Sequence, residues 1–384
     1  MTLASLRGVA PLLLSLLLAC GGSSSPLLGA ASDGGTDSAS GPAIDAGTAD
    51  ASDDDSATSP DGGASSATPI TAPPDTWTWV DFPDSKCGSG SATGIGINPH
   101  AGSTELTIYL EGGGACSDAA SCWGANPTAD NMAGYDATTF AAAKQLKYAL
   151  LDRALAANPL AQSNLVYVPY CTGDMHAGTT VAQLTGDGGT IPTYFWGAHD
   201  LDLFLRRLVP TFTGTTRVYL YGTSAGGFGT VLNFDRVARA FGVRVDVIDD
   251  SGPAITAKGQ TTNQGIFNAW GIQVPAACAG CNSLPQVLSF DRAQQPKSRY
   301  GFLSFAEDDV IAPRFGYAVA EYPAVISGYS SSLASDANAA TFVVTNETSH
   351  VVESDGTLAS QFLPWLKLML SDDATWKDAT YAHP

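Results

Sequence analysis

The sequence predicts an α/β fold with a mostly parallel central sheet, helices on both faces of the sheet and a small cap or lid region. Three observations predict it: short apolar runs alternate with helical patterns, the runs are almost continuously apolar, and one run leads through a glycine-flanked serine into a helical pattern. Strands that alternate with helices favour a parallel sheet with crossover helices. Runs without polar alternation are typical of a sheet that is covered on both faces.

The expected strands are short runs that are rich in β-branched and aromatic residues. They lie at 106–110, 165–168, 217–221, 243–248, 300–305 and 341–344. The spacing of apolar residues predicts helices at 139–156, 201–208, 227–241 and 358–370. The stretch 256–297 shows no regular pattern, so we expect it to form the cap over one end of the sheet.

Composition excludes one class of partner. The 384 residues carry a formal net charge of −19, a hydrophobic fraction of 44% and only 18 Lys and Arg residues. This hydrophobic fraction is sufficient for a large core. Phosphate binding needs clustered Lys and Arg, and the chain has no such cluster. We therefore expect no nucleic-acid partner.

The first twenty residues have the pattern of an export signal. Arg7 is their only charged residue, and 11–19 form a Leu-rich apolar run that is too short to span a bilayer. The run leads into LLACG at 17–21, which resembles a bacterial lipobox, a signal whose Cys becomes the lipidated mature N-terminus. We expect 1–20 to be a lipoprotein signal peptide and Cys20 to anchor an exported cell-envelope protein. The alternative is an ordinary cleaved signal in which Cys20 occurs by chance.

The rest of the chain divides into a linker and one domain. Residues 21–75 contain nine Asp, no Lys or Arg, and few large apolar side chains, so they cannot bury enough surface to offset chain entropy. We expect a disordered tether at 21–75 and the folded domain at 76–384. No later stretch reaches eighteen apolar residues, so the lipid on Cys20 is the only membrane contact that we expect.

Six further cysteines predict three disulfides, because an even count is typical of exported proteins with a disulfide framework. They are Cys87, Cys116, Cys122, Cys171, Cys278 and Cys281. Sequence alone allows any pairing among them. Cys278 and Cys281 also have the spacing of half a zinc site, but no second Cys or His pair has metal spacing. We therefore expect no metal.

The strongest functional signal is GTSAG at 222–226, which matches the G-x-S-x-G pattern of a nucleophile elbow. An apolar strand precedes this motif and a helical pattern follows it, as the elbow requires. Its glycines permit a tight turn that exposes the Ser224 hydroxyl, and the next helix points its amino terminus at a developing oxyanion. Ser224 is therefore the candidate nucleophile of an α/β hydrolase.

A second signal is LEGGG at 110–114, where three glycines directly follow an apolar strand. In α/β hydrolases such a loop supplies backbone N–H groups to the oxyanion hole. The alternative is a flexible turn. A phosphate-binding loop is disfavoured because no Lys-Ser or Lys-Thr follows the glycines.

The base and the acid follow from the chain order Ser, acid, His that this fold requires. Two of the five histidines, His350 and His383, lie after Ser224. His383 is at the extreme end of the chain, whereas His350 lies close behind a strand and before the last helix. Two pairs of acids compete for the remaining place. Asp308 and Asp309 follow the strand at 300–305 and fit best, whereas Asp249 and Asp250 end the preceding strand.

These motifs together resemble the pectin acetylesterase family, which includes the animal Wnt-deacylating Notum enzymes. The resemblance covers most of 85–370 and is carried by LEGGG with Cys116 behind it, GTSAGG at 222–227, Asp308 and His350. Further landmarks are YCTGDMH at 170–176 and DSGP at 250–253. The resemblance implies an α/β-hydrolase fold and serine carboxylesterase chemistry that needs no cofactor.

Residue roles also follow from the resemblance. It implies that Ser224 is the nucleophile, Asp308 the acid and His350 the base. The implied oxyanion donors are the backbone N–H groups of Gly113, Gly114 and Ala225, and the implied disulfides are Cys87–Cys171 and Cys116–Cys122. Proximity in sequence pairs Cys278 with Cys281.

Three positions depart from the plant members of this family. Ala115, Thr223 and Thr348 stand where those members have Trp, Cys and Cys. The loss of the Trp changes the wall of the acyl pocket, so the substrate does not follow from the resemblance.

We expect an exported carboxylesterase that removes acetyl or other short acyl groups, with acetylated polysaccharide as the candidate substrate. Short chains are favoured because 256–297 does not have the pattern of a long apolar groove. One alternative is a lipase-like or polyester-active hydrolase, with an acyl pocket lined by aromatic residues that otherwise belong to the core: Trp123, Phe195, Trp196 and Trp270. A second alternative is a non-catalytic surface-binding lipoprotein.

Overall fold

The computed structural model describes residues 68–186 and 188–384, which belong to one compact unit, Gly63–Pro384. The expected signal peptide, Cys20 and most of the expected linker lie outside the described residues. Within 68–75, Ile70 is buried against the core and its N–H donates to Thr211 Oγ1 at 2.7 Å. Part of the segment that we expected to be linker therefore packs against the folded domain.

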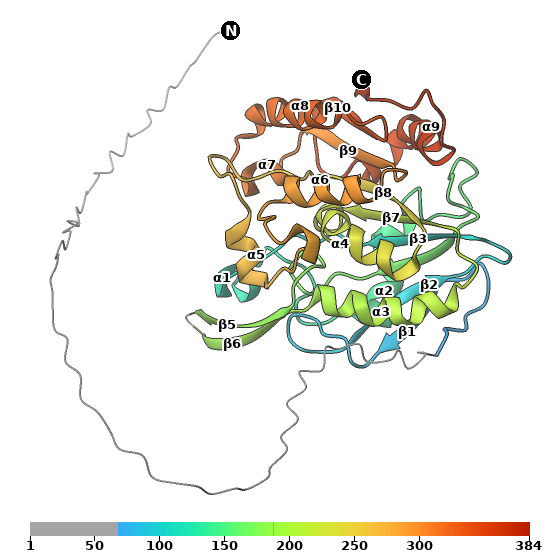
Figure 1. The fold of residues 1–384 in the computed structure, drawn as a ribbon. Coiled ribbons are helices and arrows are strands. Elements are labelled where there is room, and N and C mark those ends of the chain that lie inside the picture. Colours follow the sequence, from blue (N-terminus) through green and yellow to red (C-terminus); the bar gives the residue numbers. More distant parts are fainter. Residues whose placement is uncertain (1–67, 187) are drawn as a thin grey trace, which may run out of the picture. The chain divides into compact units, whose positions relative to one another are not determined.

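A nine-stranded sheet forms the centre of the described part (Figure 1). Its strand order is β1-β2-β4-β3-β7-β8-β9-β10-β11, and only β2 runs antiparallel to its neighbours. The strands are β1 Thr78–Phe82, β2 Thr93–Asn98, β3 Glu105–Leu110, β4 Asn164–Val168, β7 Arg217–Thr223, β8 Arg244–Asp250, β9 Tyr300–Glu307, β10 Ala339–Thr348 and β11 Ala379–Ala382. All six expected strands are confirmed.

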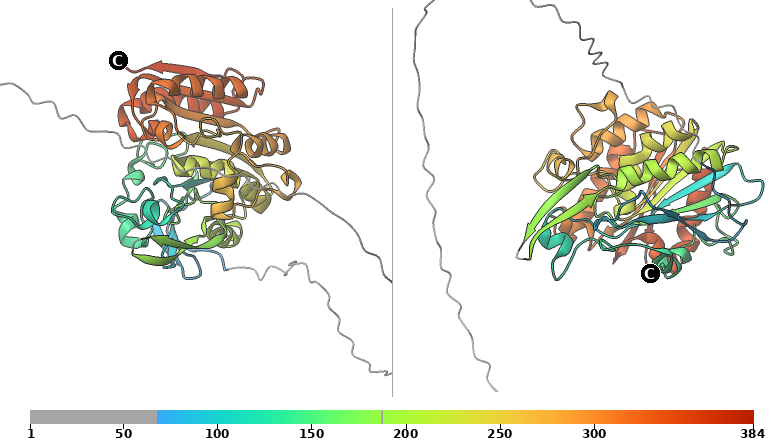
Figure 2. Two further views of the ribbon diagram at one scale, coloured as in Figure 1. Left: turned by 90° about the vertical axis from the view of Figure 1, so that its left-hand side faces the viewer. Right: turned by 90° about the horizontal axis from the view of Figure 1, so that it is seen from below.

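Helices cover both faces of the sheet (Figure 2). One face packs against α3 Gly197–Thr211, α4 Ala225–Phe241, α6 Leu284–Gln294 and α8 Tyr322–Leu333. The other face packs against α9 Ala359–Leu370 and the segment around α2 Ala137–Ala141. Side chains of the strands alternate between the two layers: Leu220 packs on the first, and Tyr219 and Tyr221 pack on the second. The expected mostly parallel sheet with helices on both faces is confirmed.

The prediction of a helix at 139–156 is wrong. Only α2 and a single 3-10 turn, Lys144–Lys147, lie near it, and turns follow. Polar side chains there bond to the backbone in place of helical hydrogen bonds: Asp152 accepts the N–H of Ala154, and Asn158 donates to the carbonyl of Leu150. Such local bonds compete with a helix. The other three expected helices are present in α3, α4 and α9.

The region 256–297 is more regular than we expected. It contains α5 Gln264–Trp270, and its second half is α6, which packs on α4 within the helical layer. A hairpin that we did not predict, β5 Thr180–Gly186 with β6 Gly189–Phe195, contacts α5 and α1 Ala119–Trp123 (Figure 1). No helix in 68–186 or 188–384 combines the length and the hydropathy that crossing a membrane requires.

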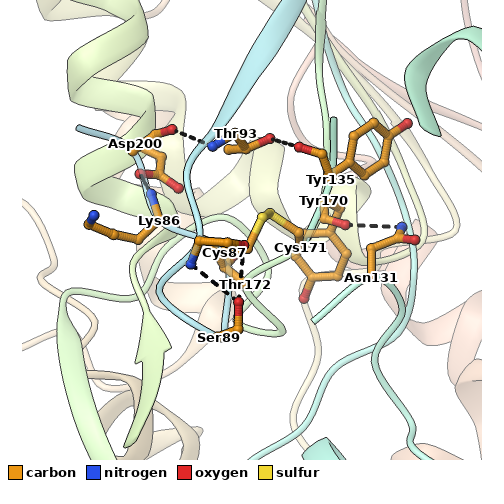
Figure 3. Close-up of a disulfide and its surroundings, with 12 residues drawn as sticks. Lys86, Cys87, Ser89, Thr93, Asn131, Tyr135, Tyr170, Cys171, Thr172 and Asp200 are labelled. Atoms are coloured by element: carbon orange, nitrogen blue, oxygen red, sulfur yellow. Dashed lines mark hydrogen bonds between the residues drawn. A yellow bond between two sulfur atoms is a disulfide. The ribbon is translucent and has the colours of Figure 1, made fainter. Parts of the chain in front are cut away.

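All three expected disulfides are present: Cys87–Cys171, Cys116–Cys122 and Cys278–Cys281. Cys87–Cys171 joins the segment after β1 to the loop after β4, where Tyr170 also lies (Figure 3). The N–H of Gly88 donates to the Cys171 carbonyl at 2.7 Å, so backbone hydrogen bonding supports the same junction.

Candidate active site

Ser224 occupies a sharp turn between β7 and α4. Its backbone has φ +54° and ψ −119°, a conformation that a non-glycine residue rarely adopts, and the residue lines a cavity at the end of the strand. A Cβ atom at Gly222 would collide with the carbonyl of Gly226, and one at Gly226 would collide with the carbonyl of Leu110. The glycines of GTSAG are therefore required by close backbone packing, as the elbow motif predicts.

His350 lies between Ser224 and Asp308. Its Nε2 is 2.8 Å from Ser224 Oγ, and its Nδ1 is 2.7 Å from Asp308 Oδ2. Asp308 is fully buried, and its other oxygen accepts the N–H groups of Val310 at 2.9 Å and Ile311 at 2.8 Å. These bonds fix the carboxylate, so it holds the imidazole in one orientation.

The competing acids lie elsewhere. Asp309 is exposed, and the structure gives it no hydrogen bond to His350. Asp249 is buried and accepts hydrogen bonds from Tyr300 Oη at 2.6 Å and from the N–H of Gly252. Asp250 accepts the N–H groups of Val352 and Glu353, which follow His350 in the chain. Of the four acids, only Asp308 bonds to the imidazole.

The glycine loop after β3 lies against the elbow. Within the described ranges, none of the hydrogen bonds uses the N–H of Gly113, Gly114 or Ala225, so these donors are free to bind an oxyanion. Gly114 and Ala225 line the same cavity as Ser224. The loop is held in place because Gly113 accepts the N–H of Asp130 at 2.8 Å and the N–H of Ala115 donates to Thr128 at 3.0 Å.

Two buried residues support this loop, and the sequence did not assign them a role. The Glu111 carboxylate accepts the N–H of Tyr170 at 3.0 Å, and burial raises the pKa of Glu111 to about 7. The Glu111 carbonyl lies 2.8 Å from His176 Nε2, which donates to it. Burial lowers the pKa of His176 to about 4, so this imidazole is neutral at pH 7. The motif YCTGDMH therefore positions the glycine loop, although its histidine does not reach Ser224.

An apolar cavity of about 590 Å³ opens beside Ser224. Its apolar walls come from α4, α5 and the turn after β9, and include Phe228, Ile266, Phe267, Trp270 and Ile311. The region 256–297 therefore supplies part of the apolar wall, through Ile266, Phe267 and Trp270.

Of the four aromatic residues considered for an acyl pocket, only Trp270 lines the cavity. Its Nε1–H donates to the Cys116 carbonyl at 2.8 Å, next to the glycine loop. Phe195 is buried beside Trp270, whereas Trp123 donates to Thr193 in the β5–β6 hairpin and Trp196 stacks on His199. These three belong to the core or the surface rather than to the cavity.

Among the described residues, no group of three or more His, Cys, Asp or Glu side chains is placed to hold a metal ion. The functional side chains all follow carboxyl ends of parallel strands: Ser224 follows β7, Asp308 follows β9 and His350 follows β10. The fold and this site define the class of the protein as an α/β hydrolase in which a serine, a histidine and an aspartate lie in line.

Comparison with known proteins identifies the family. The family model for Pectinacetylesterase matches residues 78–290, more than half of the chain, so the chain belongs to this family. The expected membership of the pectin acetylesterase family is thus confirmed. The matched span contains the glycine loop and Ser224 but ends before Asp308 and His350, whose assignment depends on the geometry given above.

Curated relatives are named palmitoleoyl-protein carboxylesterase NOTUM. The Drosophila melanogaster protein is 28% identical over 214 residues, which cover 50% of this chain and 31% of that protein. The Schmidtea mediterranea protein is 29% identical over 165 residues, 41% of this chain and 30% of that protein. The matching part of the chain thus spans less than a third of the length of these relatives.

Solved structures agree with the fold. Crystal form II of the Wnt deacylase Notum from Drosophila has a TM-score of 0.52 at 18% identity and covers 71% of this chain and 85% of that chain. Crystal form I has a TM-score of 0.55 at 16% identity and covers 80% of this chain and 97% of that chain. The similarity confirms the expected α/β-hydrolase architecture.

Proposed function

We propose that this protein hydrolyses esters of apolar acyl chains longer than butyryl, with Ser224 as the nucleophile, His350 as the base and Asp308 as the acid. One observation carries the proposal: Ser224 is hydrogen-bonded to His350 and opens onto an apolar cavity of about 590 Å³. A cavity of this size is in the range that encloses a drug-sized apolar ligand, so it is much larger than an acetyl group needs.

The proposed reaction follows the arrangement of the site. His350 Nε2 takes the proton of Ser224 Oγ as that oxygen attacks the ester carbonyl, and Asp308 orients the ring and stabilises the imidazolium. The N–H groups of Gly114 and Ala225, which line the cavity, and that of Gly113 bind the oxyanion. The protonated imidazole then releases the alcohol, and water hydrolyses the acyl-enzyme by the same steps.

The walls of the cavity support a longer acyl chain than the sequence suggested. Each methylene buried against these side chains contributes about 0.8 kcal/mol. Ala115 lines the cavity where plant members of the family have Trp, so a large side chain is missing from this wall. A non-catalytic role is disfavoured because the three side chains already lie in line for proton transfer.

Deacetylation of a polysaccharide is the second candidate. It is favoured by the description of the matched family, Pectinacetylesterase, whereas the curated relatives are named for a longer acyl group. Because the oxyanion hole contacts only the carbonyl, the acyl cavity distinguishes the two candidates.

Export remains part of the proposal. The LLACG motif with Cys20 supports a lipidated, exported protein held on the cell envelope. The three disulfides support the same conclusion, since disulfides persist in oxidising compartments and are rare in the cytosol. Labelling with radioactive palmitate in a bacterial host, with Cys20→Ala as the control, tests it. Label that persists in Cys20→Ala contradicts lipidation at this residue.

The substrate class is tested by measuring kcat/KM for p-nitrophenyl esters from C2 to C12, with Ser224→Ala as the blank. We expect a maximum near C8, give or take about two carbons, because the cavity accommodates a medium apolar chain. A maximum at C2 to C4 would contradict the proposal and support deacetylation. Acetylated pectin and acetylated xylan, assayed by acetate release, test that second candidate directly.

A further inference from the structure

Asp250, the last residue of β8, is bonded to the backbone beside both reacting side chains. Its carbonyl accepts the N–H of Ser224 at 2.7 Å. Its carboxylate accepts the N–H of Val352 at 3.0 Å and the N–H of Glu353 at 2.9 Å, directly beyond His350. The side chain is only 1% exposed. Asp250 therefore lies behind the site and does not contact the substrate cavity.

The backbone that Asp250 holds is strained. Val351 has φ +63°, which is a genuine outlier for a β-branched residue, and Ser251 has φ +67°. Ser251 Oγ donates to Asp250 Oδ1 at 2.9 Å and accepts the N–H of Val351 at 3.2 Å. Such conformations persist only where surrounding contacts enforce them. Here the enforcing contacts are the three hydrogen bonds from the His350 turn to Asp250 and Ser251.

We propose that Asp250 is a positioning residue, which holds the turn after His350 so that Nε2 of the imidazole points at Ser224 Oγ. The inference rests on the proposed function, because it concerns the alignment of the same base and nucleophile. Its carboxylate also adds a second buried negative charge near the imidazole, beside that of Asp308. A nearby negative charge favours the imidazolium that forms in the reaction.

The hold of Asp250 on the turn after His350 depends on the charge state of its carboxyl group. Burial raises the pKa of its carboxyl to about 6, and the hydrogen bonds from Glu353, Val352 and Ser251 oppose this rise. The titratable groups that act on it or on which it acts are Asp249, Tyr148 and His350, whereas Glu353 contacts it through the backbone N–H alone. A protonated carboxyl has one oxygen that must donate, so it cannot accept both N–H groups and Ser251 equally well.

The test is the rate at which a fluorophosphonate labels Ser224, measured from pH 4 to pH 9. Asp250→Asn should lower the rate at pH 8 by about ten- to a hundredfold, as expected for a misplaced base. Because a protonated Asp250 holds the turn less well, the ratio of the wild-type rate to the Asp250→Asn rate should shrink as the pH falls below about 6.

Asp249→Asn is the matched control. It removes a neighbouring buried carboxylate that bonds to Tyr300 and Gly252 rather than to the His350 turn. It should be labelled at the wild-type rate at pH 8, with the wild-type dependence on pH. If Asp250→Asn does not fold, Ser251→Ala removes the bonds that Ser251 Oγ makes to Val351 and to Asp250 Oδ1, and it should still slow labelling.

A folded Asp250→Asn protein that is labelled at the wild-type rate at pH 8 overturns the inference. A folded Ser251→Ala protein with the wild-type rate overturns it as well. A wild-type protein that does not react with the probe at any pH instead contradicts the proposed function, so the two failures are distinguishable.

Discussion

His350 Nε2 lies 2.8 Å from Ser224 Oγ, although the two residues are 126 positions apart in the chain. The contact exists because β7, β8, β9 and β10 are parallel neighbours in the sheet and present their carboxyl ends at the same edge. Asp308 completes the line from the end of β9, the strand between β8 and β10. The sheet therefore assembles the site from segments that are remote in sequence.

The first prediction concerns the two reacting side chains. Ser224→Ala and His350→Ala should each lower kcat for p-nitrophenyl esters by about four orders of magnitude or more, because members of a triad act as a unit. Circular dichroism and thermal unfolding should show that both variants are folded. Retention of a tenth of the wild-type activity in either folded variant would be incompatible with the proposed roles.

A second prediction distinguishes the neighbouring acids. Asp308→Asn should lower kcat by up to about four orders of magnitude, because the imidazole loses its orienting anion. Asp309→Asn is the matched control and should have little effect, since Asp309 is exposed and not bonded to His350. A damaging Asp309→Asn together with a mild Asp308→Asn would show that the acid is misassigned.

How much of this site the sequence predicts depends on the type of interaction. The G-x-S-x-G motif and the order Ser, acid, His identify Ser224 and His350 because they are local or topological rules. The choice between Asp308 and Asp309 is different, since both follow the same strand. It is decided by a turn in which Asp308 accepts the N–H groups of Val310 and Ile311, which cannot be read from the sequence.

The supporting residues could not be predicted for the same reason. Glu111, His176 and Asp250 act through hydrogen bonds to backbone groups in distant segments. The sequence around each of these residues does not indicate which distant backbone groups it bonds to. Only the folded topology brings them together.

Strand prediction succeeded where the runs are continuously apolar and failed elsewhere. β2 has the sequence TGIGIN, in which two glycines interrupt the apolar pattern. Both glycines are required by packing, because a Cβ atom at Gly94 would collide with the carbonyl of Val80 and a Cβ atom at Gly96 would collide with the Phe140 ring. α8 was missed because Ser and Gly interrupt its apolar pattern, and it packs against β9 and β10.

A third prediction concerns the wall of the acyl cavity. Ala115→Trp should fill part of the cavity and lower kcat/KM for the C8 ester by about tenfold or more, since several buried methylenes lose their contacts. The C2 ester should be affected much less. Ala120→Trp, on the exposed face of α1 and outside the cavity, is the control. Equal losses for the C2 and C8 esters would show that Ala115 does not control chain length.

The fourth prediction compares two disulfides. Cys87–Cys171 has a sequence separation of 84, so replacing both cysteines by Ser should lower the free energy of unfolding by about 4–5 kcal/mol in the chain-entropy account. Cys116–Cys122 has a separation of 6, for which the same account gives about 2 kcal/mol. Its removal should instead lower kcat, because Cys116 lies two residues beyond Gly114. Urea unfolding and ester assays of both double variants measure these effects, and a reversed order of stability losses would contradict the account.

The fifth prediction concerns the pH dependence of stability. Glu353 is buried, and burial raises its pKa to about 8, so the folded state favours the protonated carboxyl. This contribution to the free energy of unfolding is present below about pH 4 and is lost as the pH rises through 8. Glu353→Gln should therefore be more stable than the wild type at pH 8.5, by on the order of 4–5 kcal/mol. Near pH 4 the two proteins should have similar stability, and an equal difference at both pH values would refute the raised pKa.

The central claim is that Ser224 is a nucleophile activated by His350. Its most direct test is mass-spectrometric mapping of the full chain after reaction with a fluorophosphonate probe at pH 8. We expect a single adduct on the peptide that contains Ser224, no adduct in Ser224→Ala, and labelling slowed by several orders of magnitude in folded His350→Ala. An adduct on a different serine, or undiminished labelling of Ser224 in His350→Ala, would contradict the claim.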